Sequence, residues 1–133
     1  MKLTDKINKY YFNLLLKKKE VYQKVINGKV YLSDKYIISI LDYNDSLIGL
    51  NYCNNKAPLK EFIDNIDLHD YIDVTNILIG LNYVKLNNVT VDPKYINLYK
   101  GCQFKINVTS DIKPVLVYDK ENLVGFILPC KEY

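Results

Sequence analysis

The chain has 133 residues, the usual size of one domain, with 49% hydrophobic and 25% charged residues. This balance excludes a disordered tail, a collagen-like rod and a membrane bundle. The formal net charge is +3, and all 18 basic residues are lysines. Because lysine lacks the planar fork with which arginine reads guanine, base-specific DNA recognition is disfavoured, whereas looser contact with phosphates is not.

The positive charge is unevenly distributed. Residues 1–31 carry eight lysines against two acids, a net charge of +6, whereas the rest of the chain has a net charge of −3. This asymmetry indicates one surface that faces a polyanion or an acidic partner, with a solvated lysine face as the alternative.

Cysteine usage and hydropathy bear on the cellular compartment. Cys53, Cys102 and Cys130 are odd in number and widely spaced, so the sequence predicts free thiols and no zinc site. There is no apolar N-terminal stretch of signal-peptide length and no 18-residue apolar run. We therefore expect a cytoplasmic protein that makes no membrane contact.

Residues 4–17 have the pattern of an amphipathic helix, with Thr4 or Asp5 as its cap. At 100° per residue its lysines lie within an arc of about 80°, opposite the apolar residues. The apolar residues are Ile7, Tyr11, Leu14 and Leu15, and the lysines are Lys2, Lys6, Lys9 and Lys17. Continuing the helix would place Lys18 on the apolar face, so we expect a break there.

A β-meander is predicted after the helix. Two β-prone runs, 21–26 and 29–32, flank Asn27-Gly28, the strongest sequence signal for a two-residue hairpin turn. Further strands are expected over 35–41 and 46–50.

The middle of the sequence is less regular. We expect a short helix over 59–67 and a strand over 83–91 that turns at Asn87-Asn88. Residues 74–81 fit a helix or a strand, because so short an apolar run has no diagnostic period.

The last third repeats the order of the first. Asp92-Pro93 favours a helix start, Gly101 ends the predicted helix at 94–100, and three strands follow. These strands are 102–108, 114–118 and 123–128. The sequence thus predicts one α+β domain, 1–133, with similar helix-plus-antiparallel-meander halves at about 1–56 and 84–133 and a helical or irregular connector at 57–83.

No pattern in the sequence indicates catalysis. His69 is the only histidine, and the five glycines form no phosphate-binding loop. The acids at 61–73 are typical of a solvated face, with a catalytic carboxylate pair as the alternative. We predict no catalytic residue, no metal site and no cofactor.

Two regions of the sequence resemble a known family. Residues 29–38 (KVYLSDKYII) form the first, and the second comprises 91–96 (VDPKYI), 113–118 (KPVLVY) and 123–129 (LVGFILP). Together they resemble the bacterial DNA sliding clamp, the β subunit of the replicative polymerase, and small clamp-like proteins of phages and mobile elements. The family domain consists of two similar halves, each a helix with strands, in agreement with the predicted order.

The resemblance implies two sites. Clamp helices offer basic side chains to DNA phosphates, a role that would fall to Lys6, Lys9, Lys17, Lys94 and Lys100. The terminal strand of the family borders a groove for client peptides, and Leu128, Pro129 and Cys130 occupy the matching positions. This chain departs from the family in holding one such domain where clamps string three, and in ending its last strand with Cys130-Lys131.

The resulting hypothesis is a non-enzymatic, clamp-like binding module from a phage or mobile element. It would act through a protein partner or through non-specific contact with duplex DNA, and a single domain would need to form a homo-oligomer or bind another component. One alternative is a small inhibitor or mimic that blocks a host protein, as anti-defence proteins do. The other is a small enzyme.

Overall fold

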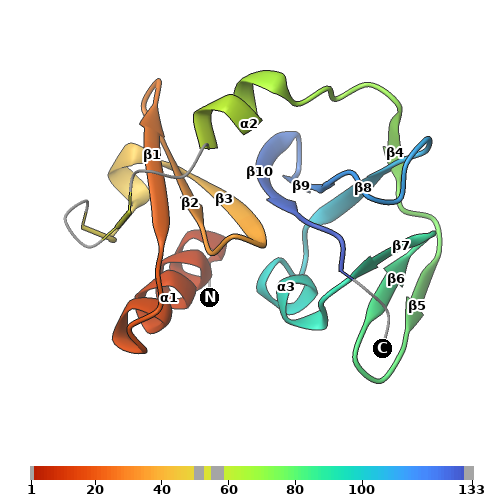
Figure 1. The fold of residues 1–133 in the computed structure, drawn as a ribbon, viewed down its shortest axis with the longest axis horizontal. Coiled ribbons are helices and arrows are strands. Elements are labelled where there is room, and N and C mark those ends of the chain that lie inside the picture. The colour runs from red at the N-terminus through yellow and green to blue at the C-terminus, as the bar shows by residue number, and fades with distance from the viewer. Residues whose placement is uncertain (1, 50–52, 55–58, 131–133) are drawn as a thin grey trace. The chain divides into compact units, whose positions relative to one another are not determined.

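The computed structural model describes residues 2–49, 53–54 and 59–130, and the chain divides into two compact units, 1–67 and 68–133 (Figure 1). The paired strands of the described residues are antiparallel, and three α-helices occur in the same chain. The α+β class expected from the sequence is therefore confirmed.

The first unit consists of a helix followed by a three-stranded meander. Its elements are α1 (Leu3–Leu16), β1 (Tyr22–Ile26), β2 (Lys29–Ser33), β3 (Ile37–Asp42), a 3₁₀ turn (Tyr43–Asp45) and α2 (Leu59–Asn65). The predicted hairpin is confirmed: Val25 pairs with Val30, and Asn27 and Gly28 have φ of 50° and 77°. Both turn residues adopt the left-handed conformation that asparagine and glycine tolerate.

The predicted break at Lys18 is also confirmed. Lys18 has φ of 58°, and its N–H donates to the Leu15 carbonyl at 3.0 Å. The Lys19 N–H donates to the Leu14 carbonyl at 2.9 Å. This pair of bonds is a Schellman motif, which satisfies the last helical carbonyls although no glycine is present.

Two local predictions for the first unit are wrong. The helix begins at Leu3, with Lys2 as its N-cap and no side-chain cap, so neither Thr4 nor Asp5 caps it. Residues 46–49 form no strand, and Leu50 lies outside the described residues. The Leu47 N–H donates to the side chain of Asn8 at 2.9 Å, so the loop is bound to α1 and not to a strand.

The second unit contains two antiparallel sheets. Its elements are β4 (Tyr71–Asp73), β5 (Ile77–Ile79), β6 (Val84–Leu86), β7 (Val89–Val91), α3 (Pro93–Leu98), β8 (Gln103–Asn107), β9 (Val115–Asp119) and β10 (Asn122–Ile127). One sheet has the neighbours β10-β9-β8-β4 and the other is β5-β6-β7. The strand expected over 83–91 is the β6–β7 hairpin, and its Asn87 has φ of 55°.

Residues 74–81, for which the sequence left helix and strand open, contain β5. The connector expected at 57–83 therefore holds α2, β4 and β5 within its described residues. The helix expected at 94–100 covers 93–98, because Asp92 caps it by accepting from the Lys94 N–H at 2.9 Å and Gly101, with φ of 94°, follows its end.

Each unit has its own set of buried apolar side chains. In the first unit these include Ile7, Tyr11, Val30, Leu32, Ile37 and Leu41. In the second they include Leu86, Val91, Tyr95, Tyr99, Val115, Val117 and Ile127. The order of one helix and three antiparallel strands occurs over 3–42 and again over 93–127, once in each unit.

Candidate functional site

Helix α1 is anchored to the meander by a buried tyrosine. Tyr11 is fully buried, and its hydroxyl donates to the Leu32 carbonyl on β2 at 3.0 Å. The same oxygen lies 2.9 Å from Oγ of Ser39 on β3. One side chain thus ties the helix to two strands, and burial of its ring adds hydrophobic stabilisation.

A second buried side chain on the same helix holds the loop that follows β3. Asn8 is 6% exposed. Its Nδ2 donates to the Asp45 carbonyl at 2.8 Å, and its Oδ1 accepts from the Leu47 N–H at 2.9 Å. Because the amide group pairs with backbone at both ends, its burial is compensated and α1 is fixed in rotation.

The opposite face of α1 carries the lysines expected to contact DNA. Lys9 and Lys17 are exposed and Lys6 is half-buried. Among the described residues, none of the three forms an ion pair. Lys17 is the C-cap residue directly after α1, and at 100° per residue its position continues the face of Lys6 and Lys9. We call these three residues the lysine face, and their charges are available to an external anion.

Two large apolar side chains adjoin the lysine face. Phe12 is 54% exposed and Leu16 is 66% exposed, and at 100° per residue both precede Lys9 around the helix. Their four-residue spacing makes them neighbours on the helix surface. Sequence analysis did not single them out, because it assigned apolar residues of this helix to the core.

The other two predicted DNA-binding lysines lie in the second unit. Lys94 is exposed in the first turn of α3, and its ammonium lies 4.9 Å from the Tyr95 ring centroid. Lys100 is exposed but follows the end of α3, so the prediction that both lie on one helix is wrong. The shorter helix results from the C-cap at Tyr99.

The predicted partner-binding segment follows β10 and touches another strand. The Cys130 N–H donates to the Thr90 carbonyl on β7 at 2.8 Å, while Leu128 remains 38% exposed and Pro129 is half-buried. The pKa of the Cys130 thiol is raised, mainly by partial burial and to a smaller extent by the negative charge of Asp92. The segment therefore covers the outer edge of β7 with its backbone.

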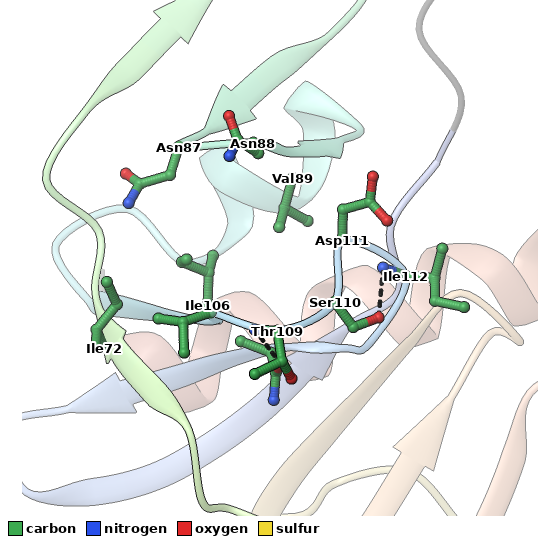
Figure 2. A pocket seen from close by; sticks show the side chains of 11 residues that line it. Ile72, Asn87, Asn88, Val89, Ile106, Thr109, Ser110, Asp111 and Ile112 are labelled. Atoms are coloured by element: carbon green, nitrogen blue, oxygen red, sulfur yellow. Dashed lines mark hydrogen bonds between the residues drawn. The ribbon is translucent and has the colours of Figure 1, made fainter.

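A cavity of about 550 Å³ lies within the second unit (Figure 2). It is open to solvent and is lined by the β6–β7 turn, by Ile72 and Ile106 on two strands, and by the loop after β8, where the Ile112 N–H donates to Ser110 Oγ at 3.3 Å. Asp111 is the only titratable side chain among the described lining residues. The other polar side chains of the lining carry amide or hydroxyl groups, among them Ser110 next to Asp111.

No cluster of three or more His, Cys, Asp or Glu side chains in the described part of the chain is arranged to hold a metal ion. Among the described residues, no helix has both the length and the apolarity to cross a bilayer.

In comparisons with known proteins, no family model, no curated protein and no solved structure matches this chain.

Proposed function

We propose that this chain is a non-enzymatic, clamp-like binding module that contacts duplex DNA through the lysine face of α1. The observation that supports this proposal is the combination of three lysines, two on the outer face of α1 and one at its C-cap, with two buried anchors, Tyr11 and Asn8, on the inner side of the helix. A helix held in this way presents its charges in a fixed arrangement, which lowers the entropy lost on binding.

The chemistry of lysine favours contact without sequence preference. An ammonium group meets a phosphate oxygen as a point charge, and the chain has no arginine to form bidentate bonds with guanine. Binding would be driven by the release of counterions from the DNA backbone.

The order of the elements gives further support to a clamp-like module. Helix and antiparallel meander occur over 3–42 and over 93–127, as the resemblance to sliding clamps implies. One such pair of segments is too small to encircle a duplex, so the module would act with further copies or with another component.

The proposal is tested by equilibrium binding to two unrelated duplexes of equal length at about 50 mM salt, where phosphate contacts are strong. The combined Lys6→Gln, Lys9→Gln and Lys17→Gln variant should lose affinity by at least about tenfold on both duplexes. Glutamine has nearly the helix propensity of lysine, so circular dichroism should show α1 intact.

Lysines in the second unit supply the controls. Lys113 and Lys120 are exposed and lie outside helices and strands, and replacing both by glutamine should leave affinity within about twofold. The Lys94→Gln, Lys100→Gln variant removes as many charges as the Lys113/Lys120 variant. It shows whether Lys94 and Lys100 contribute to DNA binding. Equal loss in the α1 variant and the Lys113/Lys120 variant would mean that only net charge matters, contrary to the proposal.

A second candidate function is contact with a protein, as in an inhibitor or mimic, and the exposure of Phe12 and Leu16 favours it. The Phe12→Ser, Leu16→Ser variant should keep its DNA affinity within about twofold if phosphate contacts dominate. If it loses as much affinity as the lysine variant, or if the wild type binds neither duplex, the face suits a protein partner better than DNA.

A further inference from the structure

Strand β5 is an edge strand whose apolar side chains are exposed on both faces. Ile77, Leu78 and Ile79 are 57%, 53% and 78% exposed, and the nearby Leu81 is 98% exposed. Ile77 lies opposite Leu86, and Ile79 lies opposite Val84. Directly paired residues share a face of the sheet, so Ile77 and Ile79 lie on the same face as Leu86 and Val84. This face is buried at β6 and exposed at β5.

The backbone of β5 also has an open side. The Asn76 carbonyl accepts from the Asn87 N–H at 2.8 Å, and the Gly80 N–H donates to the Tyr83 carbonyl at 2.9 Å. Hydrogen bonding alternates along an antiparallel strand, so the backbone N–H and carbonyl of Leu78, like those groups of Asn76 and Gly80, point toward β6. The backbone groups of Ile77 and Ile79 point away from β6, toward the open side.

The position of β5 is fixed by its turn. A Cβ built on Gly80 would lie 2.4 Å from the Tyr83 ring, so only glycine allows the ring to rest on this backbone. The edge of β5 is therefore held in place by packing at its end.

The two edges of this small sheet differ. The outer side of β7 is covered where the Thr90 carbonyl accepts from Cys130, whereas in the described residues β5 pairs with β6 alone. Edge strands are usually protected by charges, prolines or bulges. Residues 74–84 contain no charged residue and no proline.

We infer that β5 is a self-association surface that pairs with β5 of a second copy of this chain, antiparallel and about a two-fold axis through Leu78. In that register Ile77 of each copy lies opposite Ile79 of the other. Ile77 and Ile79 of the two copies together have four outward N–H groups and four outward carbonyls. All of them would be paired, because each Ile77–Ile79 pair exchanges two hydrogen bonds. The inference does not depend on the DNA-binding proposal.

A second copy suits this edge better than a charged peptide. A copy brings the same uncharged side chains, so no charge must be removed from water as the edges meet. An isologous contact of this kind closes at two copies. A strand of three residues buries far less than the roughly 1,600 Å² of a standard interface, so the dimer should be weak and dependent on concentration.

Sedimentation velocity of the full chain from micromolar to millimolar concentration tests the inference, with a monomer–dimer shift as the expected result. Ile79→Lys should raise the dissociation constant by at least about tenfold, because the ammonium would be desolvated at the edge. Ile79→Pro should do the same by removing an outward N–H while leaving the bonds to β6 intact.

The matched control is Ile112→Lys. Ile112 is 80% exposed, close to the 78% of Ile79, and lies in the loop after β8, so this variant should dimerise within about twofold of the wild type. A chain that stays monomeric at millimolar concentration, assembles without limit, or responds equally to both lysine variants would overturn the inference.

Disulfide trapping tests the register, in a background where the three native cysteines are serine. Leu78→Cys faces itself across the proposed axis in a non-hydrogen-bonded pair, where Cα atoms lie about 4.5 Å apart and a disulfide can form. Ile77→Cys faces position 79 and should not cross-link to itself. Equal cross-linking of both variants would contradict the proposed pairing.

Discussion

The lysine face of α1 and the open edge of β5 are two exposed surfaces with opposite physical characters. On α1 the backbone groups away from the helix ends are paired within the helix, so its exposed face presents side chains to water. On β5 the backbone itself is open, and no charge lies within residues 74–84. A solvated lysine face needs no partner to be stable, whereas an uncovered apolar edge favours association.

The largest expected effect concerns the anchor beneath the lysine face. Tyr11→Ala removes a fully buried ring and its hydrogen bonds, and should lower the free energy of unfolding by about 3–5 kcal/mol. Tyr11→Phe keeps the ring but leaves Ser39 without the tyrosine hydroxyl, which should lower it by about 1–3 kcal/mol. Urea denaturation followed by circular dichroism measures both.

The control for this prediction is another tyrosine. Tyr36 is 60% exposed, and Tyr36→Ala should change the free energy of unfolding by no more than about 0.5 kcal/mol. Similar losses at Tyr11 and Tyr36 would show that α1 is not anchored as described.

A smaller effect is expected at the turn that supports β5. Asn87 Oδ1 accepts from the N–H groups of Thr75 and Asn76 at 3.1 and 3.0 Å, and its φ is 55°. Asn87→Ala removes both bonds and places alanine in a left-handed conformation, so it should lower the free energy of unfolding by about 1–3 kcal/mol. It should also weaken self-association, because β5 would be less firmly held.

Two further variants separate the causes at this turn. Asn87→Gly removes the same bonds but tolerates the positive φ, so it should be less destabilising than Asn87→Ala by about 1 kcal/mol. Asn88→Ala, at the exposed neighbouring position, should stay within about 0.5 kcal/mol of the wild type. If alanine and glycine at position 87 behave alike, backbone conformation contributes little there.

The elements that sequence analysis predicted correctly are those fixed by local chemistry. Asn27-Gly28 determines its hairpin through the φ values of two adjacent residues, and Asp92 caps α3 through a bond to Lys94, two residues away. Neither depends on distant parts of the chain.

The features that could not be predicted from the sequence depend on contacts between distant residues. The strand expected at 46–50 does not form over the described residues 46–49, where the Leu47 N–H donates to the side chain of Asn8, 39 residues earlier. The cover of β7 by Cys130 joins residues that are 40 positions apart. For β5, the short apolar run left helix and strand open, and its exposure follows only from its place at the sheet edge.

The salt dependence of duplex binding tests the central claim most directly. The logarithm of the binding constant should fall linearly with the logarithm of salt concentration, with a slope contribution of about 0.9 for each lysine that contacts a phosphate. The Lys6→Gln, Lys9→Gln, Lys17→Gln variant should therefore have a slope shallower than that of the wild type by up to about 2.7, while self-association through β5 hardly changes with salt. A wild type whose slope equals that of the variant, or that does not bind duplex DNA even at low salt, would contradict the account.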